Sequence, residues 1–206
     1  MTTAIQTARM TGEQIEQSAQ VLSRAFFDDP LMTYFLPEEE RRTKALPWFM
    51  GVATKYGHKR GEVETTAGTV EGAAIWLPPG KTHIPALQMM AAGMYQAPFR
   101  MGPGNFMRFM GALGIMEKLH KESTPEDHWY LMVLGVDPPR QGQGVGSALM
   151  APVLGRADAA GVPCYLETQK DINVKLYRKH GFDVVVEDDL PKGGPHYWTM
   201  KRMPRA

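Results

Sequence analysis

The first sixty residues place apolar side chains at helical spacing. After Thr11, a residue type that caps helices, apolar residues recur every three or four positions at Ile15, Ala19, Leu22 and Phe26. This spacing predicts a helix that ends at 28–30, because Pro30 disfavours helical backbone in the residue before it. We expect a second helical region from about 31 through 59, interrupted by Pro37 and Pro47. A weak alternation over 4–9 predicts an edge strand before both.

Two strand patterns and a longer helical segment follow. Residues 62–66 and 69–77 predict a hairpin that turns at Ala67-Gly68. Residues 84–120 have helical character, with interruptions at Pro98 and at 102–104. Seven methionines lie in this segment beside several aromatic residues. Because Met-rich helices form adaptable pockets as well as ordinary cores, a substrate lid and plain packing both stay open.

The second half alternates strands and helices. Its clearest strand is 128–136, which is apolar on both faces, as a central strand covered by helices would be. The pattern then predicts a helix over 144–160, a strand over 163–168, a helix over 173–180, and strands over 181–186 and 196–201. This order predicts an α/β protein with a mixed sheet covered by helices. With no internal repeat and no long linker, 1–206 is expected to be a single domain.

Composition removes several classes of function. Hydrophobic residues make up 43% of the 206 residues and charged residues 22%, which is typical of a globular protein. A net charge of +1 argues against nucleic-acid binding, which needs a clustered positive excess. The single cysteine, Cys164, excludes a disulfide framework and a multi-thiolate zinc site, and we expect no metal. Since no signal sequence or membrane-spanning run is evident, a cytoplasmic protein without membrane contact is expected.

A glycine-rich loop joins the central strand to the next helix. It reads Asp-Pro-Pro-Arg-Gln-Gly-Gln-Gly-Val-Gly-Ser over 137–147. Three alternate glycines remove every Cβ from the inner side of the turn, so that successive N–H groups point into one volume at the positive end of a helix dipole. Such a loop binds an anion, most naturally a phosphate or pyrophosphate. A plain strand-to-helix turn is the alternative.

Two common phosphate-binding patterns do not fit this loop. A P-loop needs a lysine after its glycines, and none follows here. The dinucleotide fingerprint needs glycine at 147, where Ser147 stands, although Glu167 lies about 20 residues downstream, as the ribose-binding acid of that fingerprint would. Nucleotide hydrolysis and dinucleotide binding are therefore disfavoured.

The loop and its surroundings resemble the GNAT superfamily of N-acetyltransferases. Residues 141–146 resemble its Q/R-x-x-G-x-G/A signature, 134–138 its L-x-V-x-P strand end, and 173–182 its N-x-x-L-Y-x-x-x-G-F block. The resemblance is sharp over 129–182 and elsewhere extends only to the order of elements. It implies a GNAT-like fold, a central mixed, mostly antiparallel twisted sheet flanked by helices. The helical insertion would span about 82–122 and the acetyl-CoA-binding half about 126–190.

The same resemblance implies acetyl-CoA as co-substrate and a set of residues that bind it. The pyrophosphate would lie on loop N–H groups, with the Ser147 hydroxyl beside Gln141, Gly142, Gln143, Gly144, Val145 and Gly146. Backbone groups of Leu134 and Val136 would hold the pantetheine, and Gly135 between them suits a bulge or a close ligand approach. Asn173 would bind the pantetheine or cap its helix.

Acyl transfer from a thioester to an amine needs two proton movements. Tyr177 matches the tyrosine that the family uses as general acid toward the CoA sulfur; packing on the sheet is the alternative role. Glu167 ends the strand beside the central one, and a carboxylate of raised pKa there would accept the amine proton directly or through water. An exposed strand-end acid is the other interpretation of Glu167. His128 and His196 are alternative bases.

The acceptor is predicted from resemblance and position. Residues 26–30 and 128–131 look like the puromycin N-acetyltransferase branch, which implies a primary amine on a small molecule and a role in antibiotic or amine modification. Asp28 and Asp29 would attract an ammonium group, and Tyr34 would stack on a planar substrate; helix termination and core packing are their structural alternatives. A protein or peptide amine as acceptor, and a non-catalytic acyl-CoA-binding module, stay open. We expect a monomer or homodimer.

Overall fold

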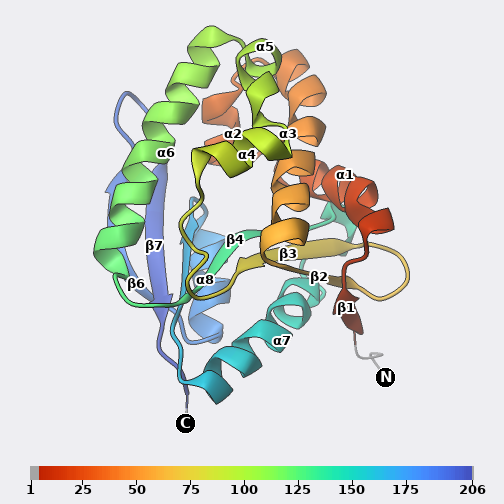
Figure 1. Cartoon of the computed structure of the whole chain (residues 1–206), viewed down its shortest axis with the longest axis vertical. Helices are drawn as coiled ribbons and strands as arrows, with labels where there is room; N and C mark the ends of the chain where they lie inside the picture. The colour runs from red at the N-terminus through yellow and green to blue at the C-terminus, as the bar shows by residue number, and fades with distance from the viewer. Residues whose placement is uncertain (1–4, 206) are drawn as a thin grey trace.

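The computed structural model describes residues 5–205. Within these residues, seven strands form one sheet in the order β1-β2-β3-β4-β5-β7-β6 (Figure 1). Every neighbouring pair is antiparallel except β4 and β5, so the predicted mixed, mostly antiparallel sheet is confirmed. The strands are β1 (Thr7–Arg9), β2 (Glu62–Thr66), β3 (Gly72–Leu77), β4 (Trp129–Val136), β5 (Cys164–Thr168), β6 (Asp183–Asp189) and β7 (His196–Arg202).

Helices cover both faces of this sheet. They are α1 (Ile15–Ala25), α2 (Pro30–Phe35), α3 (Glu39–Arg60), α4 (Ala86–Ala92), α5 (Ala97–Met101), α6 (Pro103–Ser123), α7 (Val145–Ala160) and α8 (Asp171–Lys179). Alternate residues of β3 belong to two apolar clusters: Ala73 and Ile75 to one, Ala74 and Trp76 to the other. Because strand side chains alternate between faces, the first cluster lies under α1, α3 and α5 and the second under α7. Figure 1 shows α7 and α8 together on one side of the sheet.

Prolines in the first half of the chain divide the helices less than expected. Pro37 does separate α2 from α3, but the interruption predicted at Pro47 is wrong, because α3 continues through it. Proline inside a helix removes one hydrogen bond and clashes with the preceding turn. Here Leu46 and Met50 are 0% and 2% exposed, so the packing of α3 against the core offsets that loss.

Glycine, and not Pro98, divides the helical insertion. Pro98 lies in the first turn of α5, where its missing N–H costs nothing. The chain turns instead at Gly93 and Gly102, whose φ angles of 121° and 84° strongly favour glycine. The predicted break at 102–104 is therefore found, and the one at Pro98 is shifted to Gly93.

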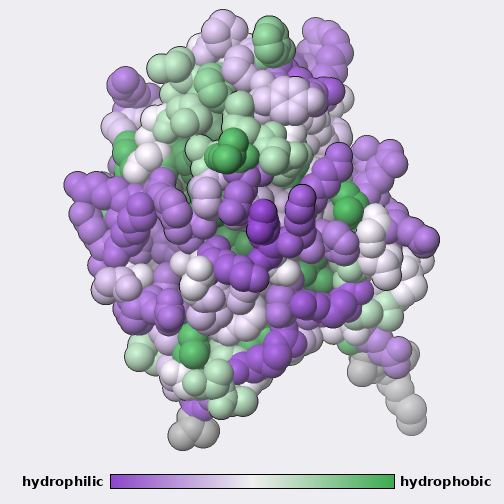
Figure 2. Space-filling model, in the orientation of Figure 1, coloured by the Kyte–Doolittle hydropathy of each residue, from purple (hydrophilic) through white to green (hydrophobic). Residues whose placement is uncertain are grey.

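The insertion leaves much of its apolar surface uncovered. Met94 and Met101 are buried, but Leu87, Phe99 and Met107 are 82%, 88% and 69% exposed. Figure 2 shows the hydrophobic side chains gathered over the α4–α6 region. Core packing thus accounts for only part of this methionine-rich segment.

The remaining elements lie close to their predicted positions. β1 falls within the strand predicted over 4–9, of which Ala4 lies outside the described residues. Cys164 is fully buried, and this burial raises the pKa of its thiol to about 12, which agrees with a core role. Within the described chain, no helix combines the length and apolar character needed to cross a bilayer.

Candidate active site

The two parallel strands separate soon after they begin. β4 pairs with β5 only where Trp129–Leu131 meets Cys164–Leu166, although β4 continues to Val136. Beyond Leu131, the edge of β4 that faces β5 has no strand partner in residues 5–205. The β3–β4 register also shifts there, with Met132 as the extra residue between Leu131 and Val133. A bulge bends its strand, and the result is a gap between β4 and β5 that exposes main-chain groups of β4.

The bulge is not at Gly135, where a bulge or close ligand approach was expected. A Cβ on Gly135 would lie 2.6 Å from Leu22 Cδ2 and 3.0 Å from Phe26 Cε2. The missing side chain therefore makes room for α1 and the residue after it, not for a ligand. The proposed contacts at Leu134 and Val136 concern main-chain atoms and do not depend on this correction.

The glycine loop presents free N–H groups at the start of α7. Gly142 and Gly144 have φ angles of 73° and 87°, and Gly144 is the N-cap of α7 without a side-chain capping bond. Within residues 5–205, the backbone N–H groups of 142–147 donate to no protein acceptor. Since N–H groups at a helix start attract anions, this loop fits a pyrophosphate. The amides of Gln141 and Gln143 instead hold the loop, because they donate to the carbonyls of Val136 (3.0 Å) and Pro139 (3.0 Å).

The Ser147 hydroxyl contacts a residue that the sequence analysis missed. Its Oγ lies 2.8 Å from Nε2 of His180, at the end of α8. Burial, followed by the charges of Arg205 and Arg202, lowers the pKa of His180. His180 follows Asn173 and Tyr177 by seven and three positions, which is the spacing of one helix face and the signal that would have found it.

Replacing Gly142 with alanine is expected to weaken acetyl-CoA binding about tenfold, because alanine disfavours a left-handed backbone and would rearrange the N–H groups of the loop. Gly161→Ala is the matched control: its φ is 67°, and, as at Gly142, a Cβ would meet no atom within 4 Å. Both variants should lose about 1 kcal/mol of stability. Calorimetric titration with acetyl-CoA separates them, and equal affinities would contradict the anion-binding role of the loop.

Tyr177, Asp29 and Lys170 lie close to one another, with Tyr177 in the apolar cluster under α7 and Asp29 at the start of α2. Tyr177 is 5% exposed and packs edge-on against Phe182, with ring centroids 5.8 Å apart. Burial, and then the negative charge of Asp29, raise the pKa of the Tyr177 hydroxyl, so it stays protonated at neutral pH. Asp29 caps α2 by accepting from the Leu31 N–H at 3.0 Å, and its Oδ2 lies 3.8 Å from Lys170 Nζ.

Glu167 approaches the gap from the opposite face. Cys164 and Leu166 belong to the cluster that contains Tyr177, so the alternation of β5 turns Glu167 to the other side. Burial raises the pKa of Glu167 to about 7, although the neighbouring hydroxyls of Tyr130 and Tyr165 oppose part of the rise. The Tyr165 hydroxyl is buried and makes no hydrogen bond of ordinary length in the described chain. A carboxyl group with this pKa exchanges protons near neutrality, as a general base must.

The two histidines considered as bases differ in their surroundings. His128 is buried, with Nε2 2.7 Å from Nε2 of His120 and Nδ1 2.6 Å from the Glu126 carbonyl. Burial lowers the pKa of both rings, that of His120 to about 3. His196 lies at the surface, 2.7 Å from Asp189, which raises its pKa. The Tyr165 ring, whose hydroxyl neighbours Glu167, lies 4.2 Å from the His120 ring and 5.9 Å from the His128 ring between centroids, so this histidine pair adjoins the glutamate whereas His196 does not.

The other predicted site residues divide between the gap and its surroundings. Asn173 does not cap its helix, which begins after Lys170; its amide donates to Thr168 Oγ1 at 3.1 Å and ties α8 to the end of β5. Asp28 is exposed, next to the buried Asp29. Tyr34 is half-buried on α2 and donates to the Pro191 carbonyl at 3.2 Å.

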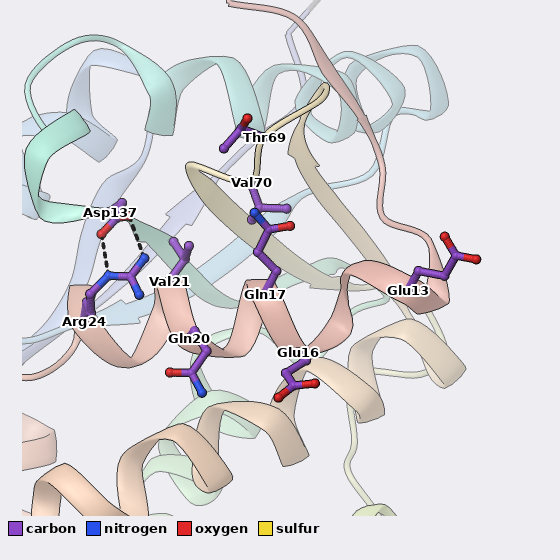
Figure 3. Close-up of a pocket in the computed structure, with 9 residues that line it drawn as sticks. All are labelled: Glu13, Glu16, Gln17, Gln20, Val21, Arg24, Thr69, Val70 and Asp137. Atoms are coloured by element: carbon purple, nitrogen blue, oxygen red, sulfur yellow. Dashed lines mark hydrogen bonds and ion pairs between the residues drawn. The ribbon is translucent and has the colours of Figure 1, made fainter.

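A hollow of about 500 Å³ lies apart from these groups, between α1 and the turn that joins β2 to β3. Polar side chains such as Glu13, Gln17 and Gln20 line it (Figure 3). At one end, Nε and Nη2 of Arg24 donate to the two carboxylate oxygens of Asp137 at 2.9 and 2.7 Å. This pair ties α1 to the end of β4, and the hollow contains neither Glu167 nor Tyr177.

Comparison with known proteins agrees with this geometry. Residues 104–182 match the Acetyltransferase (GNAT) family. The chain is 28% identical over 179 residues, 84% of its length and 72% of the relative's, to an uncharacterized N-acetyltransferase of Schizosaccharomyces pombe. Among solved structures, a Corynebacterium glutamicum protein described as a histone acetyltransferase and related acetyltransferase shares the fold with a TM-score of 0.69 and 19% identity, covering 98% of each chain. The Drosophila melanogaster polyamine N-acetyltransferase does so with a TM-score of 0.59 and 17% identity, over 96% of this chain and 98% of its own.

The fold and the family match define an enzyme of the acyltransferase class. Residues 104–182, which contain the glycine loop, match the GNAT family of acetyltransferases, whose members use acetyl-CoA as co-substrate.

Proposed function

We propose that this enzyme transfers the acetyl group of acetyl-CoA to a primary amine of a small molecule, by direct attack while both substrates are bound. The observation that carries the proposal is the gap between β4 and β5, where a protonated tyrosine and a glutamate with a pKa near neutrality approach from opposite faces. The free N–H groups of the glycine loop lie at the end of β4, where the phosphates of the co-substrate would bind.

Each predicted residue then has a task. The loop from Gln141 to Ser147 binds the pyrophosphate through its N–H groups, and the unpaired edge of β4 at Leu134 and Val136 holds the pantetheine. Asn173 orients α8 through its bond to Thr168. Acetyl-CoA supplies an activated thioester, and the chain supplies position and proton transfer.

The protons balance between two side chains. Glu167, as carboxylate, takes a proton from the acceptor amine, which attacks as the neutral base. Tyr177 donates its phenolic proton to the leaving sulfur and recovers one from water, while Glu167 releases the proton of the amine to water, so that no net proton is consumed. One C–S bond breaks and one C–N bond forms, which leaves an amide and the CoA thiol.

Several observations favour a small-molecule acceptor. The Drosophila melanogaster neighbour is described as a polyamine N-acetyltransferase that forms N-acetylagmatine. Residues 26–30 and 128–131 resemble the puromycin N-acetyltransferase branch, which supports amine or antibiotic modification. A protein or peptide amine is the second candidate acceptor. A non-catalytic module would have no need of the proton-exchanging pair Glu167 and Tyr177.

Acetyl-CoA at 100 times its Kd should stabilise the enzyme by about 2.7 kcal/mol, which is about 5–10 °C in Tm for a chain of this length. Thermal unfolding with and without acetyl-CoA measures this, and a screen of primary amines that follows CoA release tests transfer. Gly142→Ala is the control in which stabilisation should shrink. No change in Tm at saturating acetyl-CoA would refute co-substrate binding, whereas stabilisation without CoA release from any amine would favour the non-catalytic module.

A further inference from the structure

A second hollow of about 500 Å³ lies between α2, α6 and the turn that joins β6 to β7. We call it the Arg108 hollow; its lining includes Pro30, Thr33, Tyr34, Arg108, Lys192 and Pro195. Among residues 5–205, no acidic residue lines it, and its only ionisable groups besides the Tyr34 phenol are two cations. The hollow therefore presents positive charge in a protein whose net charge is only +1.

Arg108 is held in place with most of its donors free. Its Nη1 donates to the Tyr34 carbonyl at 2.9 Å and to Asn105 Oδ1 at 3.3 Å, and the guanidinium lies 5.3 Å from the centre of the Tyr34 ring. Its remaining N–H groups make no hydrogen bond within residues 5–205, and no carboxylate there forms an ion pair with it. An arginine so fixed suits a planar carboxylate.

The charge of Arg108 also affects the pKa of a nearby acid, Glu38. The Asn105 hydrogen bond lowers the pKa of Glu38 first, and the charges of Arg41 and Arg108 contribute. Glu38 does not line the Arg108 hollow. Its carboxylate accepts from Asn105 Nδ2 at 3.1 Å, so it helps to orient Asn105 behind the arginine.

Lys192 provides the second cation from a strained turn. Its φ is 60°, the one positive value among the non-glycine residues of the described chain. This left-handed backbone costs about 1 kcal/mol for a side-chain-bearing residue. The neighbouring carbonyl of Pro191 accepts from the Tyr34 hydroxyl, which ties the turn to α2. Lys192 forms no ion pair with residues 5–205, so its ammonium is available to a ligand.

The hollow adjoins the reaction site through α2. Pro30 lines it, and the preceding residue, Asp29, lies against Lys170 and influences Tyr177. The same short helix thus reaches both places. Resting on the proposed function, we propose that the Arg108 hollow binds a carboxylate of the acceptor while the acceptor's amine occupies the gap beside Glu167 and Tyr177.

This proposal sets the substrate class. It favours amines that carry an acid group, with Arg108 as the bidentate contact, Lys192 as the second charge and Tyr34 as an apolar wall. It disfavours polyamines, because their second ammonium would meet two positive side chains. The specificity would thus differ from that of the polyamine N-acetyltransferase with which the chain shares its fold.

Amines of equal length that differ in the charge of their far end test whether the hollow prefers a carboxylate. The carboxylates 4-aminobutyrate, 6-aminohexanoate and 8-aminooctanoate are compared with their carboxamides and with the diamines of equal length, at saturating acetyl-CoA. We expect kcat/KM for the best carboxylate to exceed that of its amide about fivefold and that of its diamine by more. Arg108→Gln and Lys192→Gln should each raise KM for the carboxylate about fivefold, with kcat and the amide's constants unchanged. Arg108→Lys should recover part of the loss.

Two controls exclude a general effect of surface charge and a loss of folding in the Arg108 variant. Lys118→Gln removes a positive charge from the exposed face of α6, outside the hollow, and should leave the preference for the carboxylate intact. Lys192→Gln removes no side-chain hydrogen bond found among the described residues, so it tests the hollow even if Arg108→Gln is unstable. Carboxylate, amide and diamine binding are also titrated calorimetrically, without turnover.

The results separate this proposal from the proposed function. If the enzyme binds the carboxylate selectively and the Arg108 and Lys192 variants lose this selectivity, the proposed role of the hollow is supported, whether or not CoA is released. Absence of CoA release would instead count against acetyl transfer to these amines. Equal affinity for carboxylate and amide, or a preference for the diamine, overturns the acidic acceptor while leaving N-acetyl transfer in place.

Discussion

Tyr177→Phe is expected to lower kcat about 100-fold or more, because general acid catalysis contributes at least this much and no other hydroxyl shares its helix face. The ring would keep its contact with Phe182, so folding should be preserved. The Kd of acetyl-CoA should be unchanged, since the loop that we propose binds its phosphates is separate from Tyr177. Steady-state kinetics and acetyl-CoA titration measure the two effects.

A second buried tyrosine offers the matched control. Tyr56 is 3% exposed, and its hydroxyl lies 3.5 Å from Gln88 Oε1, away from the gap. Tyr56→Phe removes the same atom and should leave kcat within about twofold, as most substitutions away from the reacting groups do. If Tyr177→Phe behaved in the same way, Tyr177 would be a packing residue and the proton donor would have to be sought elsewhere.

Glu167→Gln is expected to lower kcat/KM about 100-fold at pH 8 by removing the base. In the native enzyme only the carboxylate accepts a proton, so activity should rise with pH through the Glu167 pKa of about 7 and level off above it. The glutamine variant should lose that acid limb. A pH–rate profile with the same midpoint in both proteins would exclude Glu167 as the titrating base.

The same substitution should stabilise the protein at alkaline pH. Folding raises the pKa of Glu167 from its usual 4.5 to about 7 by burial, so the protonated form is favoured in the fold. Stability from this residue is therefore complete below pH 4.5, falls as pH rises toward 7, and is lost above 7. Glutamine cannot ionise, and a gain on the order of 2 kcal/mol at pH 8 follows.

Thermal unfolding at two pH values shows this directly. Tm of Glu167→Gln should exceed that of the native enzyme at pH 8 by about 4–8 °C, with the difference shrinking toward pH 5. Glu16→Gln, on the exposed face of α1, changes the same charge and should alter neither Tm nor activity. A lower Tm for Glu167→Gln at pH 8 would mean that the ionised carboxylate is stabilised in the fold.

The sequence predicted most of the structural features that depend on residues close together in the chain. The apolar run of β4, the glycines at 142, 144 and 146, and the apolar spacing after them specify a strand, a tight turn and a helix, because each depends on residues near in the chain. The helix boundaries predicted at prolines were less accurate. Pro47 lies inside α3 because distant core contacts outweigh a local penalty, and no local pattern reports those contacts.

Gly135 shows the same division between local and distant effects. Its lack of a side chain is visible in the sequence, but the partner that needs the space is α1, more than a hundred residues away. Arg108 and Lys192 were passed over for a similar reason. Each is an ordinary surface cation in the sequence, and only the meeting of α6, α2 and the β6–β7 turn places them around one hollow.

By itself, then, the sequence determined the class of enzyme and the glycine loop between β4 and α7, since both follow from short motifs with a direct physical meaning. Tertiary structure alone decided where β4 and β5 separate, that Glu167 and Tyr177 approach that gap from opposite faces, and how far burial shifts each pKa. The reason is physical: desolvation and strand separation depend on every element packed around a residue, and no stretch of neighbouring sequence contains that information.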